Sequence, residues 1–212
     1  MRTAGVLVVV SLLGGCTGLY YKAQERIGNE KRDILVSRVK KGREEQQAAK
    51  EQYQSTLEAF KSATGFEGGK LESVYNKLKG EYDEAEERTK DVSNRINSIE
   101  KVSNDMFSEW EREIATMGSP ALRSRSRVLF RESRTRYAAL IRKMKVVEAR
   151  AKPLLKAFQD QVLFIKHNLN AEAISSLRNN VAELDADVAR LIADIEASTR
   201  EADAFLATLP AS

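Results

Sequence analysis

The chain has very few of the residues that build catalytic centres or disulfide-stabilised domains. Its 212 residues include one cysteine, one histidine, one tryptophan and three prolines. A lone cysteine excludes a disulfide within the chain, and a lone histidine excludes a metal cluster or catalytic dyad built on two histidines. The sequence also lacks a glycine-rich phosphate-binding loop. We therefore expect no enzyme activity, no metal site and no cofactor.

Long apolar runs are missing as well. Residues 4–13 supply roughly half of the about 20 apolar residues that a membrane-spanning helix needs. Arg2 precedes this run, and Gly14, Gly15 and Cys16 follow it closely. A basic start, a short apolar core and small residues that end in a cysteine are typical of a bacterial lipoprotein signal, in which the thiol takes the lipid. An ordinary secretory signal with a coincidental cysteine is the alternative.

The lipoprotein interpretation predicts a location. Residues 1–15 would be removed as a signal peptide, and Cys16 would become the acylated N-terminus, carrying palmitate or similar chains. Two or more acyl chains give stable membrane anchoring. Thr17, rather than an aspartate, follows the cysteine. In a Gram-negative cell this favours the inner leaflet of the outer membrane, facing the periplasm.

Glycine and proline gather at two breaks, near residues 65–69 and 118–120, and a third break is the run His-Asn-Leu-Asn at residues 167–170. The breaks divide residues 16–212 into four helical stretches, roughly 20–63, 70–117, 121–167 and 171–208. Short connections make consecutive helices antiparallel neighbours. We expect a single all-α domain, an elongated antiparallel four-helix bundle or coiled coil. Pro153 lies inside the third stretch, where we expect a kink rather than a stop.

Heptad spacing supports this fold, most clearly in residues 174–209, where apolar side chains alternate spacings of three and four. In the second stretch we expect Met106, Trp110 and Met117 on the seam, with Glu113 as a charged interruption. The first stretch is the weakest, because Gly42 and its neighbours make the middle of the seam small and polar. Either a neighbouring helix approaches closely there, or the helix frays.

The ends of the fourth stretch carry recognisable signals. Asn170 has the side chain of a helix N-cap, and Glu172 lies in the first turn, where a negative charge is favourable. His167, the only histidine, lies at the preceding turn. We expect it to cap the end of the third helix rather than to act chemically.

Positive charge is concentrated in the third helical stretch. Residues 123–156 contain twelve Lys or Arg and two acids, a net charge of +10, whereas residues 67–113 and 170–205 each carry −5. The charges either pair across the flanks of neighbouring helices or leave an anion-binding face of arginines. Pairing ranks ahead, because the two acidic stretches together balance the basic one. The candidate anion-binding residues are Arg123, Arg125, Arg127, Arg131, Arg134 and Arg136.

Several segments resemble an uncharacterised bacterial family, domain of unknown function 2959, whose members are described as lipoproteins. The matching segments are Tyr20-Tyr21, ERIG (25–28), EKRDIL (30–35), GGKL (68–71), FSEWE (107–111), RTRY (134–137) and FQDQVLFIKHNLNA (158–171). The resemblance covers almost all of residues 16–212. It implies a helical exported protein and transfers no catalytic residues.

These features favour a membrane-anchored envelope lipoprotein that acts by binding or scaffolding. Its expected partners are the membrane, through the lipid, and anionic envelope polymers or lipid head groups. An envelope protein is a further expected partner, which would make the chain an accessory or regulatory subunit of an envelope enzyme or transporter. Nucleic acid is a poor candidate, because an exported lipoprotein rarely meets it.

Overall fold

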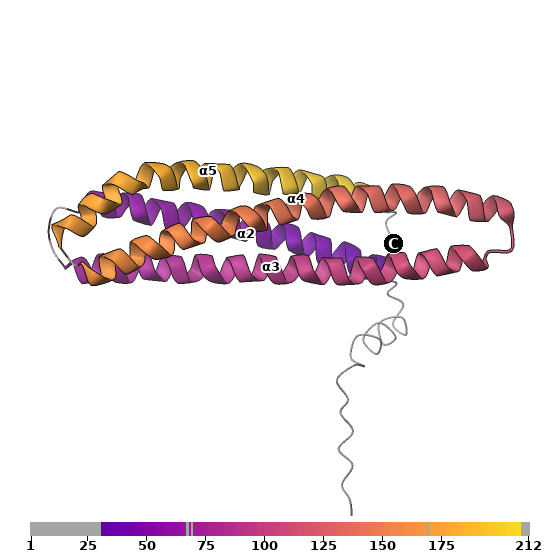
Figure 1. The fold of residues 1–212 in the computed structure, drawn as a ribbon, viewed down its shortest axis with the longest axis horizontal. Coiled ribbons are helices and arrows are strands. Elements are labelled where there is room, and N and C mark those ends of the chain that lie inside the picture. The colour runs from indigo at the N-terminus through magenta and orange to yellow at the C-terminus, as the bar shows by residue number, and fades with distance from the viewer. Residues whose placement is uncertain (1–30, 67, 69, 169, 209–212) are drawn as a thin grey trace, which may run out of the picture.

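The computed structural model describes residues 31–66, 68, 70–168 and 170–208. These residues form four helices and no strand: α2 (Lys31–Thr64), α3 (Leu71–Thr116), α4 (Pro120–His167) and α5 (Ala171–Ala207). The helices lie along one long axis, and consecutive helices run in opposite directions (Figure 1). The predicted all-α four-helix bundle is therefore confirmed. The predicted first-helix start near residue 20 lies outside the described residues.

Each helix packs against two neighbours, and the four contacts close a ring. α2 packs against α3 and α5, and α4 packs against the same two helices. This arrangement turns one apolar stripe of each helix toward the central axis. On α5 the side chains of Leu184, Val188 and Ile195 are at most 3% exposed, as the heptad spacing predicts.

Close packing, not fraying, explains the small residues of α2. A Cβ atom added to Gly42 would lie 2.8 Å from Met144 Cε of α4 and 3.1 Å from Ile99 Cδ1 of α3. Both neighbours are themselves buried, so they pack directly over the glycine backbone. Ala49, one heptad further along, is buried too. The small residues therefore let α3 and α4 approach α2.

The helix ends follow the sequence signals with one exception. α4 continues through Pro153, as expected. The Asn170 side chain accepts a hydrogen bond from the Glu172 N–H at 3.0 Å and so caps α5. The exception is His167, which is exposed at the last position of α4. Asn168 caps the helix instead, because both its backbone N–H and its side-chain amide donate to the Phe164 carbonyl.

The predicted seam of α3 is only partly right near the C-terminal end of that helix, where its apolar members are half-buried against the core. Phe107 and Ile114 are the buried residues there, whereas Trp110 is half-buried and Glu113 is exposed. Phe107 and Ile114 continue, at spacings of seven, the flank of α3 that faces α4. Earlier on that flank, Glu100 lies 2.5 Å from the Lys145 ammonium of α4. The buried stripe therefore turns from the bundle axis toward α4.

We expect Gly42→Leu to lower the free energy of unfolding by about 1–3 kcal/mol, because the new side chain overfills the contact with Met144 and Ile99. Gly80→Ala is the matched control. Gly80 is exposed on α3, and an added Cβ there meets nothing within 4 Å. It should raise stability by up to about 1 kcal/mol through helix propensity. Urea unfolding followed by circular dichroism measures both, and a stable Gly42→Leu variant would contradict the close packing.

Candidate functional site

α3 and α4 extend past the other two helices at one end of the bundle (Figure 1). α2 begins at Lys31, whose ammonium lies 2.8 Å from the Glu109 carboxylate of α3. Near the end of α5, the Phe205 ring lies 6.5 Å, centroid to centroid, from the Tyr137 ring of α4. Beyond these contacts, residues 110–136 form a two-helix hairpin, which we call the hairpin tip.

The turn of the hairpin tip is held by capping interactions. The Ser119 side chain accepts a hydrogen bond from the Leu122 N–H, and Pro120 opens α4, where its missing N–H costs nothing. The Arg123 guanidinium donates two hydrogen bonds, of 2.6 and 3.1 Å, to the Met117 carbonyl just past α3. The Arg123 side chain therefore stabilises the turn. The other five predicted arginines are the candidates for binding an anionic ligand.

A chain of aromatic rings joins the hairpin tip to the bundle. The Phe130 ring packs edge-on against Trp110 and Phe107, with ring centroids 5.5 and 5.7 Å apart. The Phe107 ring in turn lies 5.6 Å from Tyr137. The Trp110 indole N–H donates to the Ser126 hydroxyl at 3.0 Å. These contacts hold α4 against α3 in the hairpin tip. The outward face of α4 therefore has a fixed position relative to the bundle.

Burial in this aromatic cluster raises the pKa of Tyr137. A hydrogen bond with the Ser103 side chain lowers the pKa and partly offsets this effect, and the charge of Glu100 raises it slightly further. The phenol therefore stays protonated and serves packing.

Arg125, Arg127, Arg131, Arg134 and Arg136 are all exposed. None of the five guanidinium groups makes a hydrogen bond or ion pair with any residue that the structure describes. The cations further along α4 behave differently. Those that pair with a carboxylate are Lys145 with Glu100, Arg150 with Asp194, Lys152 with Glu148, and Lys156 with Asp160. Pairing thus occurs in the second half of the basic stretch and not in the predicted arginine cluster.

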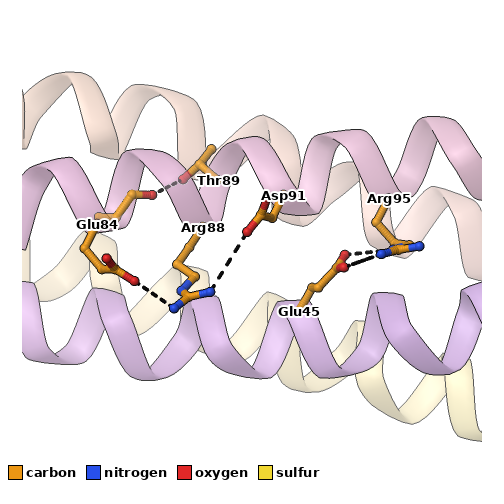
Figure 2. A network of polar contacts seen from close by, with 7 residues as sticks. Glu45, Glu84, Arg88, Thr89, Asp91 and Arg95 are labelled. Carbon is orange, nitrogen blue, oxygen red and sulfur yellow. Dashed lines mark hydrogen bonds and ion pairs between the residues drawn. The ribbon is translucent and has the colours of Figure 1, made fainter.

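The acidic side chains of α3 and α5 mostly find partners elsewhere. On α5, Glu196 lies 2.7 Å from Lys50 of α2, and Asp185 lies 2.9 Å from Lys61. Figure 2 shows the same on α3, where Arg88 lies between Glu84 and Asp91 of its own helix. The two α5 acids reach α2 because the ring order places α2 beside α5. The idea that both acidic helices neutralise α4 therefore holds only near residues 145–156.

Figure 2 also shows a salt bridge between α2 and α3 in which guanidinium and carboxylate meet at two points. The Glu45 carboxylate accepts from two nitrogens of Arg95, and both side chains are about a quarter exposed. This pairing raises the pKa of Arg95, mainly through the hydrogen bonds with Glu45. The two-point geometry is what a guanidinium offers a carboxylate or phosphate. The same geometry is unused at the five exposed arginines between residues 125 and 136.

Apolar side chains accompany these arginines. Leu122 is 64% exposed, Leu129 47% and Val128 43%. Leu122 and Leu129 are seven residues apart, so they share one face of α4. Two and three heptads beyond Leu129 on that face lie Lys143 and Arg150, and Arg150 pairs with Asp194 of α5. The face is therefore the flank that borders α5 further along, and among the described residues it continues past the end of α5 at the hairpin tip (Figure 1).

The exposure of these leucines is not predicted by the sequence pattern. Leu122 and Leu129 lie outside the predicted core seam and are seven residues apart, which indicates a shared face of α4. That this face is exposed follows only from the structure, in which α5 ends short of it.

The described residues contain no group of three or more His, Cys, Asp or Glu side chains placed to hold a metal. No helix among them is both long enough and apolar enough to cross a membrane. Cys16, the predicted lipidation residue, lies outside the described residues. The candidate site is thus a solvent-facing surface on the hairpin tip.

Comparison with known proteins gives one finding. A family model described as protein of unknown function (DUF2959) matches residues 20–209. No curated protein and no solved structure matches the chain.

Proposed function

The chain belongs to the family of proteins of unknown function DUF2959, and we propose that it is a membrane-anchored envelope lipoprotein that acts by binding or scaffolding. In this proposal a lipid on Cys16 holds the chain to the membrane, and the hairpin tip binds an anionic ligand. One observation carries the binding role: five exposed arginines of α4 have no acidic partner among the described residues.

Arginine suits such a ligand because its planar guanidinium donates two parallel hydrogen bonds to phosphate or carboxylate. The five arginines span residues 125–136, which is about 17 Å of helix at 1.5 Å per residue. A surface of that length fits a repeated anion, such as a layer of lipid head groups or an envelope polymer. The tip presents no histidine and no cysteine, so binding rather than catalysis is proposed.

A protein partner is the second candidate function. The exposed leucines of the hairpin tip favour it, because apolar surface rimmed by charge is common at protein interfaces. The chain would then be an accessory or regulatory subunit of an envelope enzyme or transporter. Crosslinking in cells separates the two functions. A stable stoichiometric enzyme or transporter partner would favour the accessory role.

We expect Cys16→Ser to abolish lipidation and membrane retention, because no other thiol in the chain can take the acyl group. Cells expressing each form are labelled with a fatty-acid probe and fractionated. Thr17→Ser is the control, since it alters the adjacent residue and keeps the thiol. A serine variant at position 16 that still takes the label and still sediments with membranes would show that the lipoprotein assignment is wrong.

The second test changes Arg125, Arg127 and Arg131 together to Gln in the unlipidated Cys16→Ser chain. We expect binding to lipopolysaccharide and anionic vesicles to weaken about tenfold or more at low salt, since each basic residue near an anionic surface contributes about 1 kcal/mol. Thermal stability should not change, because these side chains have no partners among the described residues.

The matched control changes Lys145, Lys152 and Lys156 to Gln. It removes the same charge from the same helix, but these cations pair with carboxylates. It should lower stability slightly and leave binding intact. Equal weakening by both triple variants would assign the effect to overall charge. If the parent chain binds neither probe at low salt, the anion-binding role is wrong.

A further inference from the structure

Exposed leucines of the hairpin tip share one strip of α4 with two of its arginines, Arg125 and Arg136. Arg125 lies three residues after Leu122 and four before Leu129, so the three side chains are neighbours on the helix surface. Val128, three residues after Arg125, adjoins the strip, and Arg136 continues it seven residues beyond Leu129. A surface that mixes exposed leucine with arginine suits the boundary between water and lipid, because arginine can bury its stem and keep its charged head at the polar layer.

The position of the strip is as informative as its composition. α2 begins at Lys31, beside Glu109, so the chain from Cys16 enters the bundle at the end that carries the hairpin tip. α3 runs only from Glu109 to Thr116 past this point, about 10 Å at 1.5 Å per residue. The fifteen steps from Cys16 to Lys31 cover about 22 Å even at helical spacing. A membrane that holds Cys16 is therefore within reach of the tip.

Lipid fits both halves of the strip better than a soluble polymer does. A polysaccharide or polyphosphate offers anions to the arginines but no apolar layer to the leucines. An anionic bilayer offers phosphates and, a few ångströms deeper, acyl chains. The gain from each arginine near such a surface is about fivefold in partitioning, so charge brings the tip to the membrane and the leucines hold it there.

We propose that the hairpin tip docks end-on onto an anionic phospholipid surface, with Leu122, Val128 and Leu129 in the head-group layer. The orientation rests on the proposed anchor at Cys16, whereas the affinity of the tip for lipid does not. The docked tip and the lipid together fix the rod upright on the membrane. The opposite end, where α4 meets α5, then faces away from the membrane.

The test uses the full chain with Cys16→Ser, which leaves no cysteine, so that an introduced thiol takes a polarity-sensitive dye at one site. One sample carries Leu122→Cys in the hairpin tip. Its matched control carries Leu163→Cys, a leucine that is 42% exposed on the same helix near the opposite end of the bundle. Each sample is mixed with phosphatidylcholine vesicles with or without phosphatidylglycerol, and separately with inorganic polyphosphate.

We expect the dye on Leu122→Cys to shift to the blue with phosphatidylglycerol vesicles alone, and the dye on Leu163→Cys to stay unchanged. Raising the salt from about 0.01 M to about 0.15 M shortens the screening length from about 30 Å to about 8 Å and should reduce the shift. Changing Leu122 and Leu129 to Ser, with the dye on Val128→Cys, should weaken vesicle binding about tenfold, because two partly buried leucines are lost.

Other results would overturn the proposal. Equal shifts at both sites would mean that the rod lies flat. Binding without a shift at Leu122→Cys would mean that charge alone acts, and an equal shift with polyphosphate would assign the site to a soluble polymer. No vesicle binding at low salt would exclude lipid docking. Because the assay uses an unlipidated chain, these failures are distinct from a failure of the Cys16 labelling experiment.

Discussion

Burial of one apolar stripe from each of four helices along a common axis holds the structure together, and the helix lengths decide where that burial ends. α3 and α4 have 46 and 48 residues, whereas the described parts of α2 and α5 have 34 and 37. Among the described residues, no other helix lies beside the surplus. It pairs as a two-helix hairpin, closed by the aromatic contacts of Phe107 and Phe130, and the flank of α4 that borders α5 further along is exposed there.

The sequence predicts well what depends on local spacing. Heptads in α4 and α5, the cap at Asn170 and the passage through Pro153 all follow from side chains a few residues apart. The hairpin tip could not be predicted in the same way. Whether Phe107 or Trp110 is buried depends on which helices lie alongside α3 at that level, and that depends on where two distant helices end.

The pairing of charged side chains also depends on which helices lie alongside each other at a given level of the bundle. Net charges per helix suggested that two acidic helices neutralise the basic one, but pairing requires side chains at the same level on adjacent flanks. The ring order places α2 beside both acidic helices, and its cations pair with acids of both, as the contacts of Lys31 with Glu109 and of Lys50 with Glu196 illustrate. The arginines of α4 that lie beyond those contacts keep their charge exposed. The same geometry that uncovers Leu122 and Leu129 therefore also leaves the arginines available.

The central claim is that the arginines at residues 125–136 are free in the folded chain and occupied on an anionic membrane. Arginine modification by phenylglyoxal, read out by peptide mass spectrometry, tests this directly. Without vesicles, these five arginines should react faster than Arg95, which is held by Glu45. With phosphatidylglycerol vesicles, they should become protected while Arg88, whose side chain is 41% exposed at the middle of the rod, keeps its rate. Slow modification of the five without vesicles, or no protection with them, would contradict the claim.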